Sequence, residues 1–147
     1  MMGRAFTLPS SALRYLIGHA LAYGDHVVIS SPWIGDVEVR LPLSPGVEAR
    51  REKLAEAVRK LDTTVDVYVL PEEASNDYAV SRLKRLDNVT VTEVPDIHAK
   101  AVVTDVYVYV GSANITRGGL LTNKELCTVM ENEYGDVESY VSEELDV

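Results

Sequence analysis

Hydrophobic positions along the chain follow two spacings, one typical of helices and the other typical of strands. Apolar residues recur every three or four positions in four segments, which predicts helices over residues 10–22, 45–61, 77–86 and 134–145. Runs rich in Val, Ile, Thr and Tyr predict strands over residues 27–30, 37–41, 65–70, 89–94, 98–104, 106–110 and 126–130. This alternation predicts the α/β class, with a mixed β-sheet flanked by helices on both faces.

Length and composition are those of one globular domain over residues 1–147, because 147 residues are enough to bury a core and no linker interrupts the pattern. No apolar run approaches the roughly 20 residues that span a bilayer. Arg14 and His19 interrupt the moderately apolar segment 12–23, so we expect an amphipathic first helix rather than a signal peptide, and a cytoplasmic location. The one cysteine, Cys127, excludes an internal disulfide.

The charge of the chain is unevenly distributed. The formal net charge is −9, but residues 125–147 hold 8 of the 23 acidic residues and no Lys or Arg, so the rest of the chain is nearly neutral. We interpret the acidic helical segment at about 131–147 as a solvated helix face; the alternative is a docking tail for a protein partner. Basic residues in segments 50–60 and 82–85 could contact phosphates, although exposed helix charges usually only improve solubility.

One short region carries a candidate chemical site. Its residues are His98, Lys100, Asp105, Gly111, Ser112 and Asn114. In a strand, His98 and Lys100 would share one face, because alternate side chains point the same way. An imidazole can attack phosphorus or donate a proton near neutral pH, while Lys, Ser and Asn can stabilise charge on phosphoryl oxygens. The pattern therefore predicts a phosphate site; taken singly, each residue is more often an ordinary surface, turn or loop residue.

These residues resemble the signature of the phospholipase D superfamily, which is H-x-K, four residues, D, and then a G-S-x-N turn. The resemblance continues through segments 115–119 and 123–126, and more weakly to 27–34. Five residues separate Asp105 from Gly111, where the family usually has six, so the bend near Asp105 must absorb the difference. The resemblance implies catalytic roles for His98, Lys100, Asn114 and Glu125, phosphate binding by Lys100, Ser112 and Asn114, and a structural role for Asp105 and Gly111.

The family cleaves phosphodiesters with two histidines placed on opposite sides of phosphorus, whereas this chain has one motif. Neither His19 nor His26 begins an H-x-K. The resemblance therefore implies a homodimer in which two copies of His98 share one site. It also implies a metal-independent phosphodiesterase that forms a phosphohistidine intermediate. The sequence has no cluster of carboxylates or of His and Cys with the spacing of metal ligands, so we expect no cofactor. We expect an endonuclease with nucleic acid as its substrate.

Three alternatives stay open from the sequence. A phospholipase or phosphatidyl transferase would use the same residues. A hydrolase of small-molecule diesters would do so as well. A non-catalytic phosphate-binding subunit of a larger DNA-processing complex would keep the motif without turnover, although a pure binder has no need of a nucleophile.

Overall fold

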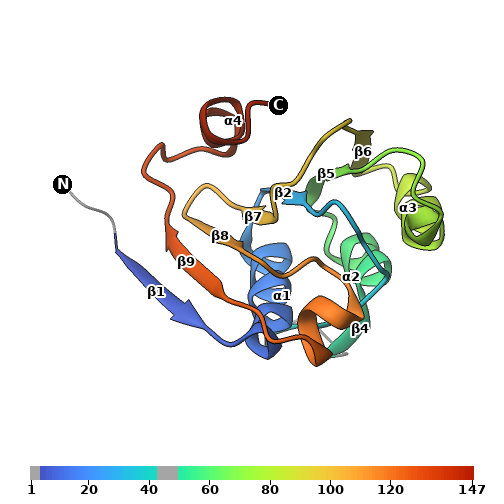
Figure 1. Ribbon diagram of the computed structural model, residues 1–147, viewed down its shortest axis with the longest axis horizontal. Coiled ribbons are helices and arrows are strands. Elements are labelled where there is room, and N and C mark those ends of the chain that lie inside the picture. Colours follow the sequence, from blue (N-terminus) through green and yellow to red (C-terminus); the bar gives the residue numbers. More distant parts are fainter. Residues whose placement is uncertain (1–3, 43–49) are drawn as a thin grey trace.

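The computed structural model describes residues 4–42 and 50–147, and its centre is a seven-stranded sheet in the order β1-β9-β8-β7-β2-β5-β6 (Figure 1). The strands of this sheet are β1 (Ala5–Leu8), β2 (His26–Ser30), β5 (Thr64–Val69), β6 (Val89–Glu93), β7 (Ala101–Val103), β8 (Tyr107–Gly111) and β9 (Cys127–Glu131). The other strands and the helices are β3 (Glu38–Arg40), β4 (Arg51–Lys53), α1 (Leu13–Tyr23), α2 (Leu54–Leu61), α3 (Asp77–Lys84) and α4 (Val137–Tyr140).

The sheet is mixed. β2, β5 and β6 are parallel, while β7, β8, β9 and β1 join the sheet by antiparallel pairing. β3 and β4 form a separate antiparallel pair. The parallel strands are connected through helices. In the antiparallel half a short turn joins β7 to β8, residues 112–126 connect β8 to β9, and β1 pairs with β9 from the other end of the chain.

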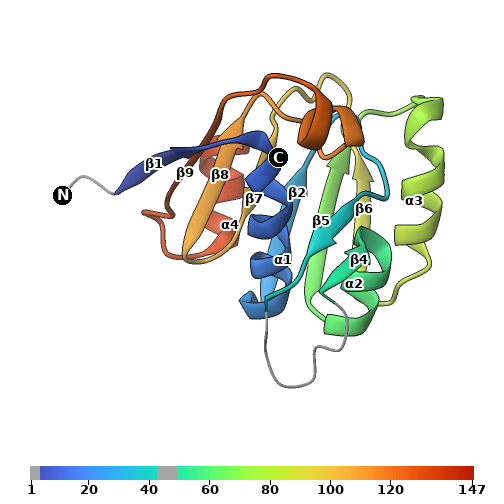
Figure 2. The same ribbon diagram turned by 90° about the horizontal axis from the view of Figure 1, so that it is seen from below.

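Alternate residues of the central strand β2 face two separate cores. Val27 and Ile29 belong to a large core on the face covered by α1, α2 and α3, and Val28 belongs to a smaller core beneath α4. Figure 2 shows α1 and α2 in front of the sheet and α4 behind it. The predicted fold class, a mixed sheet with helices on both faces, is therefore confirmed.

Several predicted element limits are wrong, for reasons that depend on neighbouring strands. The helix predicted over 45–61 is α2 from Leu54 onward, preceded by β4, and Pro45 lies outside the described residues. The strand predicted over 98–104 is β7 alone, so His98 to Lys100 form an extended lead into it. The last predicted helix is α4 followed by a π-helical turn, Val141–Leu145. β1 was not predicted, and it forms only by pairing with β9.

The acidic C-terminal segment packs on its own chain. Val137, Tyr140 and Val141 cover the smaller core, and the Glu138 carboxylate accepts a hydrogen bond from the His26 ring at 3.1 Å. The other ring nitrogen of His26 lies 2.6 Å from the Asp66 carboxylate. Burial alone would lower the pKa of His26, but the hydrogen bonds and charges of Asp66 and Glu138 outweigh it and raise the pKa above 6.5.

This raised pKa predicts a pH dependence of stability. Protonated His26 stabilises the folded protein fully below about pH 6.5, and the contribution is lost as pH rises through the higher folded-state pKa. Because the pair is partly exposed, we expect a loss of less than about 1 kcal/mol in the free energy of unfolding. Urea unfolding at a series of pH values measures it, and His26→Gln should flatten that part of the profile. An equal pH dependence in His26→Gln would contradict this assignment.

No helix among the described residues is both long enough and apolar enough to cross a lipid bilayer.

Candidate active site

The predicted motif residues other than Asp105 lie at one end of three adjacent strands. The Gly111 amide donates a hydrogen bond to the Lys100 carbonyl at 3.3 Å, and the Ser112 amide donates to the Leu126 carbonyl at 3.0 Å. These bonds continue the pairing of β7, β8 and β9 beyond their last strand residues. The chain around Lys100, Gly111, Ser112 and Leu126 therefore forms one edge, at the carboxyl ends of β2 and β8.

The strand register predicts how His98 and Glu125 lie at this edge. Ala101 pairs with Val110 and Gly111 pairs with Cys127. The backbone bonds from Gly111 to Lys100 and from Ser112 to Leu126 extend these ladders by one residue each, to within two residues of His98 and one residue of Glu125. His98 is exposed and Glu125 is half-buried. Within residues 4–42 and 50–147, no hydrogen bond joins their side chains, so the role of Glu125 in orienting His98 stays a prediction.

Two consecutive buried serines at the end of β2 hold the two halves of the motif. The Ser30 hydroxyl donates to the Ala99 carbonyl at 2.8 Å, which fixes the backbone between His98 and Lys100. The Ser31 hydroxyl accepts from the Ile115 amide at 2.8 Å and donates to the Trp33 carbonyl at 2.6 Å. Both serines are fully buried, and a buried hydroxyl has to be hydrogen-bonded. The end of β2 is therefore the support on which the motif is assembled.

The Asn114 side chain is held through its carbonyl oxygen. Its side-chain carbonyl accepts a hydrogen bond from the Trp33 backbone amide at 3.3 Å. The amide nitrogen, which carries two donors, is the end of the side chain left to bind an anion. The backbone of Asn114 is in turn covered closely by Gly119, where a Cβ would lie 2.1 Å from the Asn114 carbonyl oxygen.

Ser112 and Lys100 also have a hydrogen left to donate to an anion. The Ser112 hydroxyl accepts from the Leu126 amide at 2.9 Å, while the only acceptor for its own hydrogen among the described residues is the Leu126 carbonyl at 3.5 Å. The Lys100 ammonium uses one donor on the His98 carbonyl at 3.1 Å. An ammonium has three donors, so two are free for phosphoryl oxygens.

The turn after β8 is anchored from beneath by Tyr109, which sequence reasoning missed. Its hydroxyl donates to the Ala113 carbonyl at 3.0 Å and accepts from the Ala113 amide at 3.1 Å. Tyr109 is fully buried, and burial is the main cause that raises the pKa of this phenol. The hydroxyl therefore stays protonated and can serve both backbone groups. In the sequence, Tyr109 has only the pattern of an inward strand residue.

The structure separates Asp105 from the other motif residues. Asp105 lies in the bend between β7 and β8, at the opposite end of that hairpin from Gly111, and its carboxylate accepts from the Val137 amide at 2.9 Å at the start of α4. Gly111 is needed for close packing, because a Cβ there would lie 2.4 Å from the Leu126 carbonyl oxygen. The structural roles expected for Asp105 and Gly111 stay predictions.

No three His, Cys, Asp or Glu side chains in the described part of the chain are grouped so that they could hold a metal ion.

Comparison with known proteins identifies both a family and a fold. The model of the family described as "Cardiolipin synthase, PLD-like domain" matches residues 37–146, which includes every motif residue. No curated protein matches the chain.

Three solved structures illustrate the fold. NucT from Helicobacter pylori aligns with 99% of this chain and 96% of its own at 14% identity, with a TM-score of 0.67. Nuc from Salmonella typhimurium, described as a phospholipase D family member, aligns with 99% of this chain and 92% of its own at 16% identity, with a TM-score of 0.62. TrmBL2, described as an archaeal chromatin protein with a novel mode of DNA binding, aligns with 89% of this chain and 48% of its own at 11% identity and a TM-score of 0.53.

Proposed function

Because the chain belongs to the family of phospholipase D-like domains, we propose that it is a metal-independent phosphodiesterase, an endonuclease that cleaves nucleic acid through a phosphohistidine intermediate. The observation that carries this proposal is the single edge at which His98, Lys100, Ser112 and Asn114 meet. One nucleophile and three donors at one edge suit a phosphodiester. The fold shared with Nuc, which is described as a phospholipase D family member, supports a phosphodiesterase.

The proposed reaction has two steps. In the first, an imidazole nitrogen of His98 attacks phosphorus, the bond from phosphorus to the leaving oxygen breaks, and the partner's His98 donates a proton to that oxygen. In the second, the partner's His98 takes a proton from water as the water oxygen attacks phosphorus and the bond to His98 breaks. The product is a phosphate monoester, and both imidazoles return to their starting states.

The surrounding residues would stabilise the charge that develops during both steps. The Lys100 ammonium, the Ser112 hydroxyl and the Asn114 amide would hold the non-bridging oxygens, since each has a free donor. Glu125 would orient the imidazole and stabilise its charged form. Ser30, Ser31 and Tyr109 would act as positioning residues, because they fix the backbone on either side of these groups and do not themselves touch the substrate.

The one motif of this chain requires the second histidine to come from a second copy, so the proposed active species is a homodimer. Mixing tests this. After co-refolding of equal amounts of wild type and His98→Ala, only about one quarter of the dimers would carry two histidines, so activity should be about one quarter that of the same total amount of wild type. Mixing the two proteins after folding should give about half. Co-refolded samples that also give half would contradict a shared site.

A second candidate function is a DNA-binding module without turnover. The fold similarity to TrmBL2, whose description gives DNA binding, favours it. The complete set of His98, Lys100 and Asn114 favours the enzyme, because binding alone needs no nucleophile. A cytoplasmic location and a protein partner for the C-terminal segment stay predictions from the sequence.

A further inference from the structure

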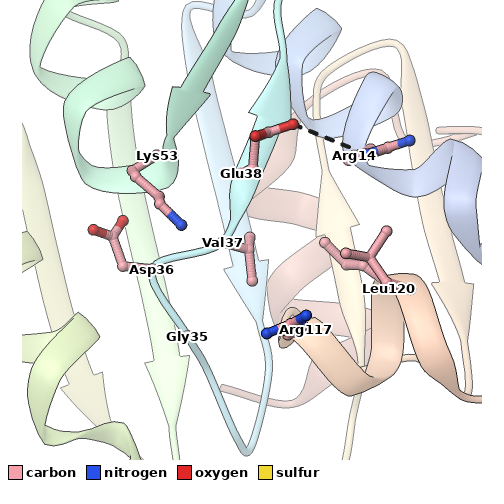
Figure 3. A pocket seen from close by; sticks show the side chains of 9 residues that line it. Arg14, Gly35, Asp36, Val37, Glu38, Lys53, Arg117 and Leu120 are labelled. Atoms are coloured by element: carbon pink, nitrogen blue, oxygen red, sulfur yellow. Dashed lines mark ion pairs between the residues drawn. The ribbon is translucent and has the colours of Figure 1, made fainter.

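A cavity of about 460 Å³ lies beside the motif loop, between α1, β3, β4 and the π-helical turn Gly118–Thr122 (Figure 3). His98, Lys100, Ser112 and Asn114 do not line it. It is nevertheless joined to the motif, because the Gly35 amide in its wall donates to the Ile115 carbonyl at 2.8 Å. Arg117, which also lines the cavity, follows Asn114 by three residues.

The two acidic residues of the cavity wall already have partners. The Asp36 carboxylate is 5% exposed, accepts from the Ala55 amide at 2.9 Å and forms an ion pair with Arg82 at 2.9 Å. The Glu38 carboxylate forms ion pairs with Arg40 at 3.1 Å and with Arg14 at 3.9 Å. Their negative charge is thus balanced by arginines and leaves little to repel an anion.

Two basic residues of the wall have no acidic partner within residues 4–42 and 50–147. Lys53 and Arg117 are both exposed, and no carboxylate in the described ranges forms an ion pair with either. In Figure 3 the nitrogen end of Lys53 points toward Val37, and the Arg117 guanidinium lies on the other side of Val37. Val37 and Leu120 supply apolar surface between and beside these charges. The cavity therefore combines a surplus of positive charge with an apolar floor.

We propose that this cavity binds a phosphate group through Lys53 and Arg117, and that the phosphate belongs to the same nucleic-acid strand whose scissile phosphate lies at the motif. This inference rests on the proposed function for the identity of the strand. A guanidinium can hold two phosphate oxygens at once, and an ammonium adds a point charge. The apolar floor contacts the sugar next to the bound phosphate. The cavity thus fixes the strand at a second point, remote from the reacting phosphorus.

Binding measurements on non-cleaving protein test this site. In a His98→Ala background, the double variant Lys53→Gln/Arg117→Gln is compared with Lys84→Gln/Arg85→Gln, which removes the same charge from exposed positions on and just after α3. The probes are a labelled single-stranded oligothymidylate of about 12 nucleotides, and thymidine 5′-monophosphate. Each affinity is measured over a range of salt concentrations. Thermal melting confirms that both double variants are folded.

We expect the cavity variant to bind the oligonucleotide about tenfold more weakly than the control variant, and to lower the slope of log K against log salt by about 0.7 to 1.4, as expected when one or two phosphate contacts are lost. Suppose that only the mononucleotide binds, and that Lys53→Gln/Arg117→Gln weakens its binding. The cavity is then a phosphate site, but the claim that its phosphate belongs to a nucleic-acid strand is overturned. If the two double variants bind with equal affinity, or if neither probe binds, the proposal that the cavity binds phosphate through Lys53 and Arg117 is overturned. The cavity variant could lose oligonucleotide binding selectively while the wild type cleaves no diester. That pair of results would support the phosphate site and contradict the proposed cleavage.

Discussion

Replacement of His98 by alanine is expected to lower kcat/KM for phosphodiester hydrolysis by about 10³-fold or more, because it removes both the nucleophile and the proton donor of the proposed shared site. His98 is exposed and its ring makes no hydrogen bond within the described chain, so the fold should be unaffected. Steady-state kinetics on bis(p-nitrophenyl) phosphate, with a thermal melt of both proteins, measures this.

The matched control for His98 is His19→Ala. The His19 ring lies 2.9 Å from the Tyr107 hydroxyl, at the start of β8, which is the end of that strand far from Gly111. Its loss should change activity by less than about threefold, since it touches nothing at the proposed site. An active His98→Ala protein, or an equal loss in both variants, would be incompatible with His98 as the nucleophile.

Gly119→Ala is expected to have the second largest effect, although residue 119 contacts no substrate. The new Cβ would meet the Asn114 carbonyl oxygen at 2.1 Å and the Asn114 amide nitrogen at 2.9 Å, so the backbone of Asn114 must move. A displacement of about 1 Å at a positioning group can cost about 10²-fold in rate. Such overpacking also costs about 1–3 kcal/mol of stability. Kinetics and urea unfolding of the same preparation measure both effects.

The neighbouring glycine provides the control. At Gly118 a Cβ would lie 3.5 Å from its nearest neighbour, the Asn123 amide nitrogen, which is ordinary contact. Gly118→Ala should therefore keep nearly full activity and stability. If both substitutions lower the rate equally, the loss comes from the flexibility of the turn and not from the position of Asn114.

The sequence predicted the fold class, but not the limits of several elements. The order and spacing of His98, Lys100 and Asn114 were enough to predict a phosphate site, because each contributes a distinct chemical group. The sheet carries them to one edge through pairing between strands that lie close in the sequence, from β7 to β9. Strand pairing also explains why His98 and Lys100 precede β7: only Ala101–Val103 lies between two strands of the sheet.

The supports of the site could not be predicted. Ser30 and Ser31 are more than 65 residues from the motif in sequence, and nothing in a run of Val, Ile and Ser shows which backbone groups their hydroxyls will bind. The side chain of Tyr109 is another example, since its inward strand pattern does not reveal a polar role. The Lys53 and Arg117 cavity likewise depends on the fold, which places β4 and the segment after β8 on the walls of one cavity. Only the three-dimensional arrangement brings these charges together.

The most direct test of the central proposal is the hydrolysis of bis(p-nitrophenyl) phosphate and of a labelled oligonucleotide by wild-type protein in excess EDTA, with His98→Ala as the blank. The proposed mechanism predicts that wild type cleaves both substrates, and that the rate for each substrate is the same with and without the chelator. His98→Ala should cleave neither substrate. Activity that disappears in EDTA and returns with a divalent ion would contradict the metal-independent mechanism. Cleavage of neither substrate under any condition would contradict the proposed phosphodiesterase itself.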